Sequence, residues 1–132
     1  LHHVVIDMER IGDLAENIAE YTLTLIDKRT NMTSEAQAEL RTMAEKTQET
    51  LRISLDIFDK RDKSRLPVVD AMEQDVDTMK MTFMNNHIDR LQLKTCDPQT
   101  GVVFTNMVST LERVADHATN IAFSTEGWTG GV

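Results

Sequence analysis

The sequence predicts an all-α protein, an antiparallel bundle of four long helices, on three observations. Apolar residues recur at alternating steps of three and four through four segments of the chain, which is the spacing of a helix that buries one face. The two prolines and five glycines are too few for a sheet with many turns. No segment shows the period-two alternation of a strand. We expect residues 1–132 to form a single domain, because a chain of this length can bury one core.

The first two helices are predicted on either side of a polar break at residues 30–34. The first runs from about Val4 to Lys28, and the second from about Glu35 to Arg61 after a capping box of Ser34 and Gln37. The seam of the first helix consists of Val4, Met8, Ile11, Ala15, Ile18, Thr22 and Leu25. The weaker seam of the second consists of Leu40, Met43, Thr47, Leu51, Ser54 and Phe58.

The last two helices follow breaks at residues 62–66 and 94–101. Pro67 is compatible with the first turn of the third helix, which should reach about Leu93. The fourth should end near Ser124, and the glycines beyond it predict a loose tail at residues 125–132. The third seam is Val69, Met72, Val76, Met79 and Phe83, and the fourth includes Phe104, Met107, Val108, Leu111, Val114, Ala115, Ala118 and Ile121. Short connections favour packing between helices that are neighbours in sequence.

Composition excludes several classes of function. The net charge of -8 argues against nucleic acid and against general adhesion to anionic lipid. No run approaches the roughly 20 apolar residues of a membrane span, so we expect no direct membrane insertion. Cys96 is the single cysteine and cannot form an internal disulfide, which favours a cytosolic setting.

One twelve-residue phrase occurs twice, as residues 8–19 (MERIGDLAENIA) and 111–122 (LERVADHATNIA). Seven of the twelve aligned residues are identical. In each copy Glu, Asp and Asn stand four residues apart, which places them on one side of a helix. Packing alone would demand only that the apolar positions be repeated. The duplication therefore predicts two related polar sites.

The repeated carboxylates point away from the predicted core. At about 100° per residue, Glu9 and Asp13 lie on the side opposite Ile11 and Ala15. Three helices carry such an outward Glu-x-x-x-Asp pair, and the third helix has one further acid a turn earlier. The members are Glu9 and Asp13, Glu73 and Asp77 with Asp70, and Glu112 and Asp116.

Like charges four residues apart repel, so repeated acidic pairs suggest a cation that relieves the repulsion. Oxygen ligands from two helices suit Fe, Mn, Mg, Ca or Zn. The alternative is an acidic surface that docks a partner and holds no metal. No Glu stands three residues before any histidine, which disfavours a ferritin-type di-iron centre and makes a metalloenzyme a distant third hypothesis. His117 lies beside the core and is interpreted as a packed or interfacial histidine.

The two phrases closely resemble the signature of the PhoU family, in which an L-E-R-I-G-D-H-A-x-N-I segment ends each three-helix repeat. The resemblance extends over residues 58–77 and over 96–104 (CDPQTGVVF), a stretch similar to the PhoU-like C-terminal domain of bacterial sodium/phosphate cotransporters. It implies that the first helix ends one repeat and that the other three form a complete second repeat. Leu14 stands where the signature has His. The first two helices of the first repeat are missing, so we expect a fragment of a longer protein.

The resemblance also implies a function. PhoU-like proteins bind multinuclear metal clusters, often of iron, through surface E/D-x-x-x-D motifs. The matching positions here are Glu9, Asp13, Asp70, Glu73, Asp77, Glu112 and Asp116. Iron is the metal that the resemblance favours, with Zn, Mn, Mg, Ca and Ni left open.

We therefore expect a non-enzymatic regulatory domain of phosphate transport. It would lie on the cytoplasmic side of the membrane, tethered through a transmembrane sodium/phosphate cotransporter that is part of the same polypeptide. The transporter segment is its expected partner, and a homodimer is left open. A metal-free helical interaction bundle is the alternative function.

Overall fold

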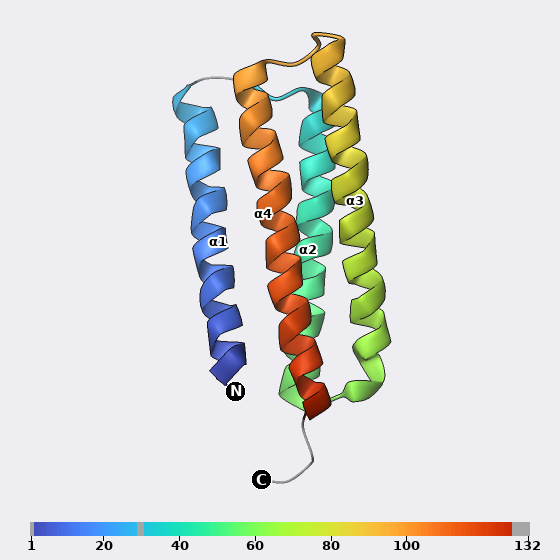
Figure 1. Ribbon diagram of the computed structural model, residues 1–132. Helices are drawn as coiled ribbons and strands as arrows, with labels where there is room; N and C mark the ends of the chain where they lie inside the picture. Colours follow the sequence, from blue (N-terminus) through green and yellow to red (C-terminus); the bar gives the residue numbers. More distant parts are fainter. Residues whose placement is uncertain (1, 29–30, 128–132) are drawn as a thin grey trace.

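The computed structural model describes residues 2–28 and 31–127, most of which lie in four long helices. The elements are α1 (His2–Asp27), α2 (Ser34–Lys60), the 3-10 helix η1 (Lys63–Arg65), α3 (Leu66–Gln92), α4 (Pro98–Phe123) and the 3-10 helix η2 (Ser124–Gly127). Successive long helices run in opposite directions (Figure 1). No strand occurs in these described ranges, and the predicted all-α antiparallel bundle is confirmed.

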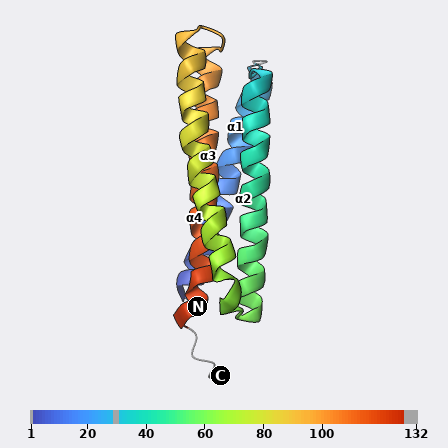
Figure 2. The same cartoon turned by 90° about the vertical axis from the view of Figure 1, so that its right-hand side faces the viewer.

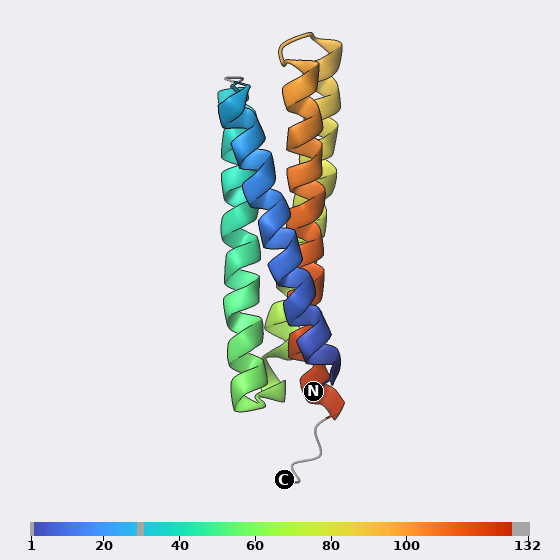
Figure 3. The same cartoon turned by 90° about the vertical axis from the view of Figure 1, so that its left-hand side faces the viewer.

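α4 is the central helix of the bundle. It packs against α1, α2 and α3, and α2 also packs against α3. α1 makes its substantial contacts with α4 and not with α2, its neighbour in sequence. α1 crosses the outside of the bundle, in front of the space between α2 and α4 (Figure 3). The prediction that neighbours in sequence pack together is therefore wrong for α1 and α2, because the side of α1 that becomes buried packs against α4 instead.

The main core lies between α2, α3 and α4. Its buried members include Met43, Val76, Phe104, Val108 and Ala115. A smaller cluster near the α2–α3 connection contains Ile57, Leu66, Val69 and Ala122. Burying one large side chain of this kind stabilises the fold by about 1.5–3 kcal/mol. The predicted seams of α3 and α4 are confirmed at these positions.

The predicted seam of α1 is wrong in part. Met8 is 44% exposed, and Ala15 and Thr22 are exposed as well. The buried apolar residues of α1 are Val4 and Leu14. Because α1 carries apolar residues on two sides, periodicity permits either side to be buried, and the contact with α4 selects one of them.

The start of α2 differs from the prediction by one residue. Thr33 is the N-cap, and its side-chain oxygen accepts a hydrogen bond of 3.1 Å from the backbone N–H of Ala36. Gln37 donates its side-chain amide to the Met32 carbonyl at 2.8 Å, instead of closing a capping box with Ser34. The polar break itself lies where the sequence predicts it.

α4 starts at Pro98, inside the break predicted for residues 94–101. Asp97 is its N-cap and accepts hydrogen bonds from the backbone N–H of Thr100 at 3.3 Å and from its hydroxyl at 2.8 Å. Proline at the first helical position loses no hydrogen bond, because that N–H has no partner within a helix. A capped proline therefore begins the helix ahead of Gly101.

The end of the described chain is more ordered than predicted. Residues 125–127 of the expected loose tail belong to η2, and Thr125 is 1% exposed. The rest of that prediction, residues 128–132, lies outside the described residues.

Candidate metal centre

α3 and α4 lie side by side and bring four of the predicted acidic residues together. Glu73 and Asp77 come from α3, and Glu112 and Asp116 come from α4. The Asp77 and Glu112 carboxyl groups lie within hydrogen-bonding reach of each other across the two helices. Figure 2 shows the α3–α4 pair on one side of the bundle and α2 on the other. The four-residue spacing within each helix places both pairs on the same side of the α3–α4 contact. We call these four residues the acidic groove.

The sequence predicts that these carboxylates point outward into solvent, but they are less exposed than that direction implies. The Glu112 side chain is only 19% exposed, and Glu73 and Asp116 are half-buried. Asp77 and Asp70 are exposed at the edge of the groove. The acidic residues do lie outside the apolar core, but the neighbouring helix covers part of them.

Burial and mutual repulsion both act on this acidic groove. Burial raises the pKa of Glu73, and the charges of Asp116, Asp77, Asp70 and Glu112 raise it further. The pKa values of Asp77 and Asp116 are also raised, first by burial and then by the neighbouring Glu112. A bound cation would remove this penalty, since it favours the ionised form of every carboxylate it touches.

Lys80 is a counter-charge within the groove. Its Nζ atom donates to Glu112 Oε1 at 2.8 Å. Its charge lowers the pKa values of Asp77 and Asp116 and so opposes the raising effect of the acids. Lys80 therefore stabilises part of the negative charge where an ion would bind.

The donor chemistry of the groove fits a hard cation. All four donors are carboxylates, the ligands preferred by Mg²⁺, Ca²⁺ and Mn²⁺ and also used by iron. Within residues 2–28 and 31–127, no three His, Cys, Asp or Glu side chains converge tightly enough to hold an ion in this side-chain arrangement. Binding would require new rotamers and release of Glu112 by Lys80. The metal would supply positive charge that bridges α3 and α4.

The remaining predicted ligands lie apart from these four. Glu9 and Asp13 are exposed on α1, which reaches α4 from a side other than that of α3. Asp70 influences Glu73 through its charge and accepts a hydrogen bond of 3.3 Å from the Gln74 side chain. The structure thus unites the second and third acidic pairs, with Asp70 at the edge, and leaves the first pair separate.

Asp7 links α1 to α4, a role that the sequence did not predict. Its Oδ1 lies 2.9 Å from His117 Nδ1, and the Asn120 side-chain amide donates to the same oxygen at 3.5 Å. The Asp7 side chain is only 13% exposed. His117 is thus an interfacial histidine between α1 and α4, as predicted. Its spacing along the helix could have predicted this contact, because Asp7 lies three residues after Val4 and four before Ile11, on the side of α1 that faces α4.

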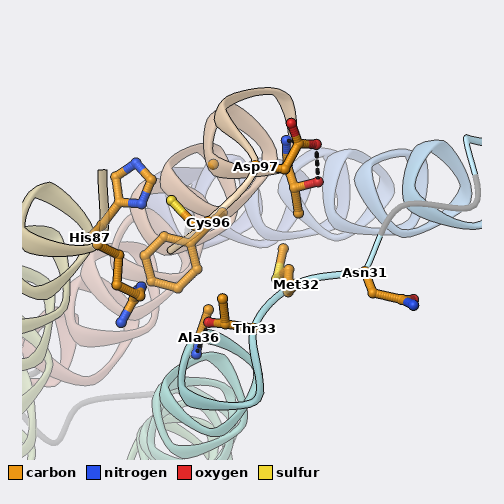
Figure 4. Close-up of a pocket in the computed structure, with 11 residues that line it drawn as sticks. Asn31, Met32, Thr33, Ala36, His87, Cys96 and Asp97 are labelled. Carbon is orange, nitrogen blue, oxygen red and sulfur yellow. Dashed lines mark hydrogen bonds between the residues drawn. The ribbon is translucent and has the colours of Figure 1, made fainter. Parts of the chain in front are cut away.

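A small pocket lies between the starts of α2 and α4 and the end of α3, at the end of the bundle opposite the start of α1 and the end of α4. His87, Cys96, Asp97 and Thr33 are among the residues that line it (Figure 4). His87 is 7% exposed, and burial together with the Arg90 charge lowers its pKa.

The packing around this pocket is close. The His87 ring packs against Phe104 with 5.4 Å between the ring centroids. A Cβ atom on Gly101 would lie 2.5 Å from His87 Cε1, so only glycine fits there without movement. Arg90 pairs with Glu39 at 2.8 Å, and both side chains are mostly buried. These contacts give the residues around the pocket a packing role.

The fold and the acidic groove together define the class of protein. It is an all-α domain in which two antiparallel helices bring carboxylates together at the surface. The family described as the PhoU domain matches residues 40–125, which is more than half of the chain. The chain therefore belongs to the PhoU family. The predicted resemblance to the PhoU family is thereby confirmed, and the second copy of the repeated phrase, residues 111–122, lies within the matched range.

A relative from Thermotoga maritima is called "Phosphate-specific transport system accessory protein PhoU homolog 1". It is 28% identical over 115 residues, which cover 87% of this chain and 49% of the relative. The chain thus spans about half the length of that protein. No solved structure matches the chain. None of the helices in residues 2–28 and 31–127 has both the length and the hydropathy needed to cross a membrane.

Proposed function

We propose that this PhoU domain is a non-enzymatic regulator of phosphate transport that binds metal ions in the groove between α3 and α4. The observation that carries the proposal is the cluster of four carboxylates on α3 and α4, in which burial and the neighbouring acids raise the pKa values of Glu73, Asp77 and Asp116. Such an arrangement destabilises the metal-free protein at neutral pH and is stabilised when a cation enters. Family membership and the name of the Thermotoga relative support the connection with phosphate transport.

Glu73, Asp77, Glu112 and Asp116 would supply the ligands, with Asp70 at the edge of the site. Family resemblance favours iron, and the oxygen-only donor set also suits Mn, Mg, Ca, Zn or Ni. A cation bridging the two helices would fix their relative position and neutralise the acidic groove. Either change alters the surface that a partner meets, which is how metal occupancy would be transmitted.

The partner in this proposal is a transmembrane phosphate transporter, with the domain on the cytoplasmic side. The stretch at residues 96–104 supports a sodium/phosphate cotransporter on the same polypeptide. The complete reading frame tests this context, because a cotransporter requires several hydrophobic spans outside the present chain. A frame without such spans would refute the cotransporter and leave the metal proposal standing.

The regulatory role is tested with Glu112→Gln/Asp116→Asn in the full-length protein. We expect phosphate uptake itself to persist, while its adjustment between phosphate-rich and phosphate-poor medium is lost. The matched control is Glu45→Gln/Glu49→Gln, which removes two charges four residues apart from an exposed side of α2. Normal adjustment in the groove variant would contradict the proposal.

A metal-free docking bundle is the second candidate function. The observation in its favour is the Lys80–Glu112 ion pair, which partly neutralises the groove without any ion. In that case the acidic surface would bind a basic partner, and chelators would not weaken that binding.

A further inference from the structure

Cys96, the single cysteine of the chain, lines the small pocket between α2, α3 and α4. The residue is half-buried. Figure 4 shows the Cys96 sulfur and the His87 ring facing the same pocket. The cavity volume is about 10 Å³, which is room for about one water molecule. The space beside the thiol therefore suits the addition of a single oxygen atom to the sulfur.

Two polar side chains that line this pocket have hydrogen-bonding groups without a partner. His87 is 7% exposed, and within residues 2–28 and 31–127 its ring makes no hydrogen bond. The Nε atom of Arg90 is buried and also has no partner in the described part of the chain. A buried polar group without a partner destabilises the fold. An oxygen atom on Cys96 would supply a partner that both groups lack.

Packing keeps these two side chains beside the pocket. The His87 ring lies between Phe104, at 5.4 Å between the ring centroids, and the close approach of Gly101. Arg90 is paired with Glu39 at 2.8 Å, and its guanidinium lies 5.2 Å from the Phe104 ring centroid. Turning either side chain toward another partner would break these contacts.

The chemistry of the two groups suits oxidation of a thiol. Burial and the Arg90 charge lower the pKa of His87, so its imidazole is neutral at neutral pH and can accept a proton. Arg90 supplies a positive charge and an N–H donor for an oxygen anion. Asp97 also lines the pocket, but its carboxylate is engaged in capping α4 through Thr100.

We propose that Cys96 is a site of reversible oxidation by hydrogen peroxide, and that His87 and Arg90 hold its sulfenic acid in the pocket. The sulfur attacks one oxygen of the peroxide, so an S–O bond forms, the O–O bond breaks and the sulfur loses two electrons. The thiol proton passes through His87 to the second oxygen, which leaves as water. His87 is thus a positioning and proton-accepting residue for Cys96.

The oxidation is reversible because no second cysteine of the chain can consume the sulfenic acid. A small thiol forms a mixed disulfide with Cys96 and releases water, and a second thiol then restores the reduced residue. The pocket is separate from the acidic groove and contains none of its residues. The proposal therefore stands or falls independently of metal binding.

The test is the rate at which hydrogen peroxide oxidises the complete chain in chelator, measured by trapping with dimedone and mass spectrometry. We expect Cys96 to react about tenfold faster than the thiol of Cys96→Ser/Gln99→Cys. This matched control moves the thiol three residues along the chain, to an exposed position that does not line the pocket. In samples without dimedone, dithiothreitol should restore the Cys96 thiol.

His87→Asn removes the imidazole and should slow the oxidation of Cys96 about tenfold. Phe104→Leu is the packing control, because it loosens the ring that packs on His87 and leaves the imidazole in place. Circular dichroism establishes that the helices of both variants are intact. The comparison of Cys96 with Cys96→Ser/Gln99→Cys does not depend on how well His87→Asn folds.

Three results would overturn the proposal. Equal rates in the natural chain and in Cys96→Ser/Gln99→Cys would show that the pocket adds nothing to the reactivity of the thiol. Equal slowing by His87→Asn and Phe104→Leu would show that His87 acts through packing alone. Direct passage to sulfinic and sulfonic acid, with no sulfenic acid trapped by dimedone, would show that the pocket does not hold the first product.

Discussion

Lys80 Nζ lies 2.8 Å from Glu112 Oε1, so a lysine of α3 holds one carboxylate that α4 contributes to the candidate metal centre. Both side chains are partly buried, at 35% and 19% exposed. The pair reduces the repulsion among the acids while no ion is bound. The same lysine opposes the entry of a cation, and this double role can be tested.

Lys80→Gln should bind Mn²⁺ about three- to tenfold more tightly, since a competing positive charge is removed from the groove. Isothermal titration calorimetry measures the change. Lys46→Gln is the matched control, because Lys46 also forms an ion pair with α3, at 3.3 Å from Asp75. Equal affinities in the Lys80 variant and the natural chain would argue that metal does not bind beside Glu112.

Asp116→Asn should stabilise the metal-free domain at pH 7. Burial and the Glu112 charge raise the Asp116 pKa above its ordinary value of 3.8 in the folded state. The stability gained by protonating this group is present below the unfolded pKa and lost as pH rises through the folded pKa. Removing the charge should therefore add roughly 0.5–1 kcal/mol at neutral pH, or a few degrees in Tm.

Thermal unfolding in chelator, followed by circular dichroism from pH 3 to 8, measures this effect. The advantage of Asp116→Asn should vanish at low pH and reverse when metal is added. Asp13→Asn serves as the control, because Asp13 is exposed outside the groove. A variant that is less stable than the natural chain in chelator would contradict the predicted repulsion.

Asp7→Ala should loosen α1 from the bundle. It removes the partner of His117 at a half-buried contact, which costs about 1–2 kcal/mol of unfolding free energy. Hydrogen exchange should show lost protection in α1 and little change in α2. Glu16→Ala, at an exposed position of the same helix, should leave α1 protection intact. Uniform loss across all helices in Asp7→Ala would refute a local role.

Gly101→Ala should destabilise the fold by about 1–3 kcal/mol, because its methyl group would lie 2.5 Å from His87 Cε1. Gly12→Ala is the matched change, since an added Cβ meets nothing within 4 Å there. It should stabilise α1 by about 0.5–1 kcal/mol through helix propensity. Urea denaturation of both variants measures the difference, and the same sign in both would contradict the packing described around His87.

The helices could be predicted because local signals agreed with the fold. Pro67, Pro98 and the polar breaks lie at or beside the helix ends that the structure shows. Met72, Val76 and Leu111 belong to unambiguous stripes and are buried as predicted. Met8 is exposed because α1 has two apolar stripes, and periodicity contains no information on which of them meets a partner.

The carboxylates of the groove could be predicted in part. The repeated Glu-x-x-x-Asp spacing identified Glu112 and Asp116 as members of one helix face. That face forms a candidate site only because α3 packs beside it. Lys80 also belongs to this site, and no sequence motif predicted its presence there. Tertiary packing also separated Glu9 and Asp13 from the other acids, although their sequence matches the Glu112 copy most closely.

The most direct test of the central claim is the metal content of protein purified without a chelator or a histidine tag. Elemental analysis should find bound metal in the natural chain and in Glu9→Gln/Asp13→Asn, and little in Glu112→Gln/Asp116→Asn. Helicity should be nearly the same in all three, because these positions lie outside the apolar core. Undiminished metal in Glu112→Gln/Asp116→Asn would contradict a metal centre between α3 and α4.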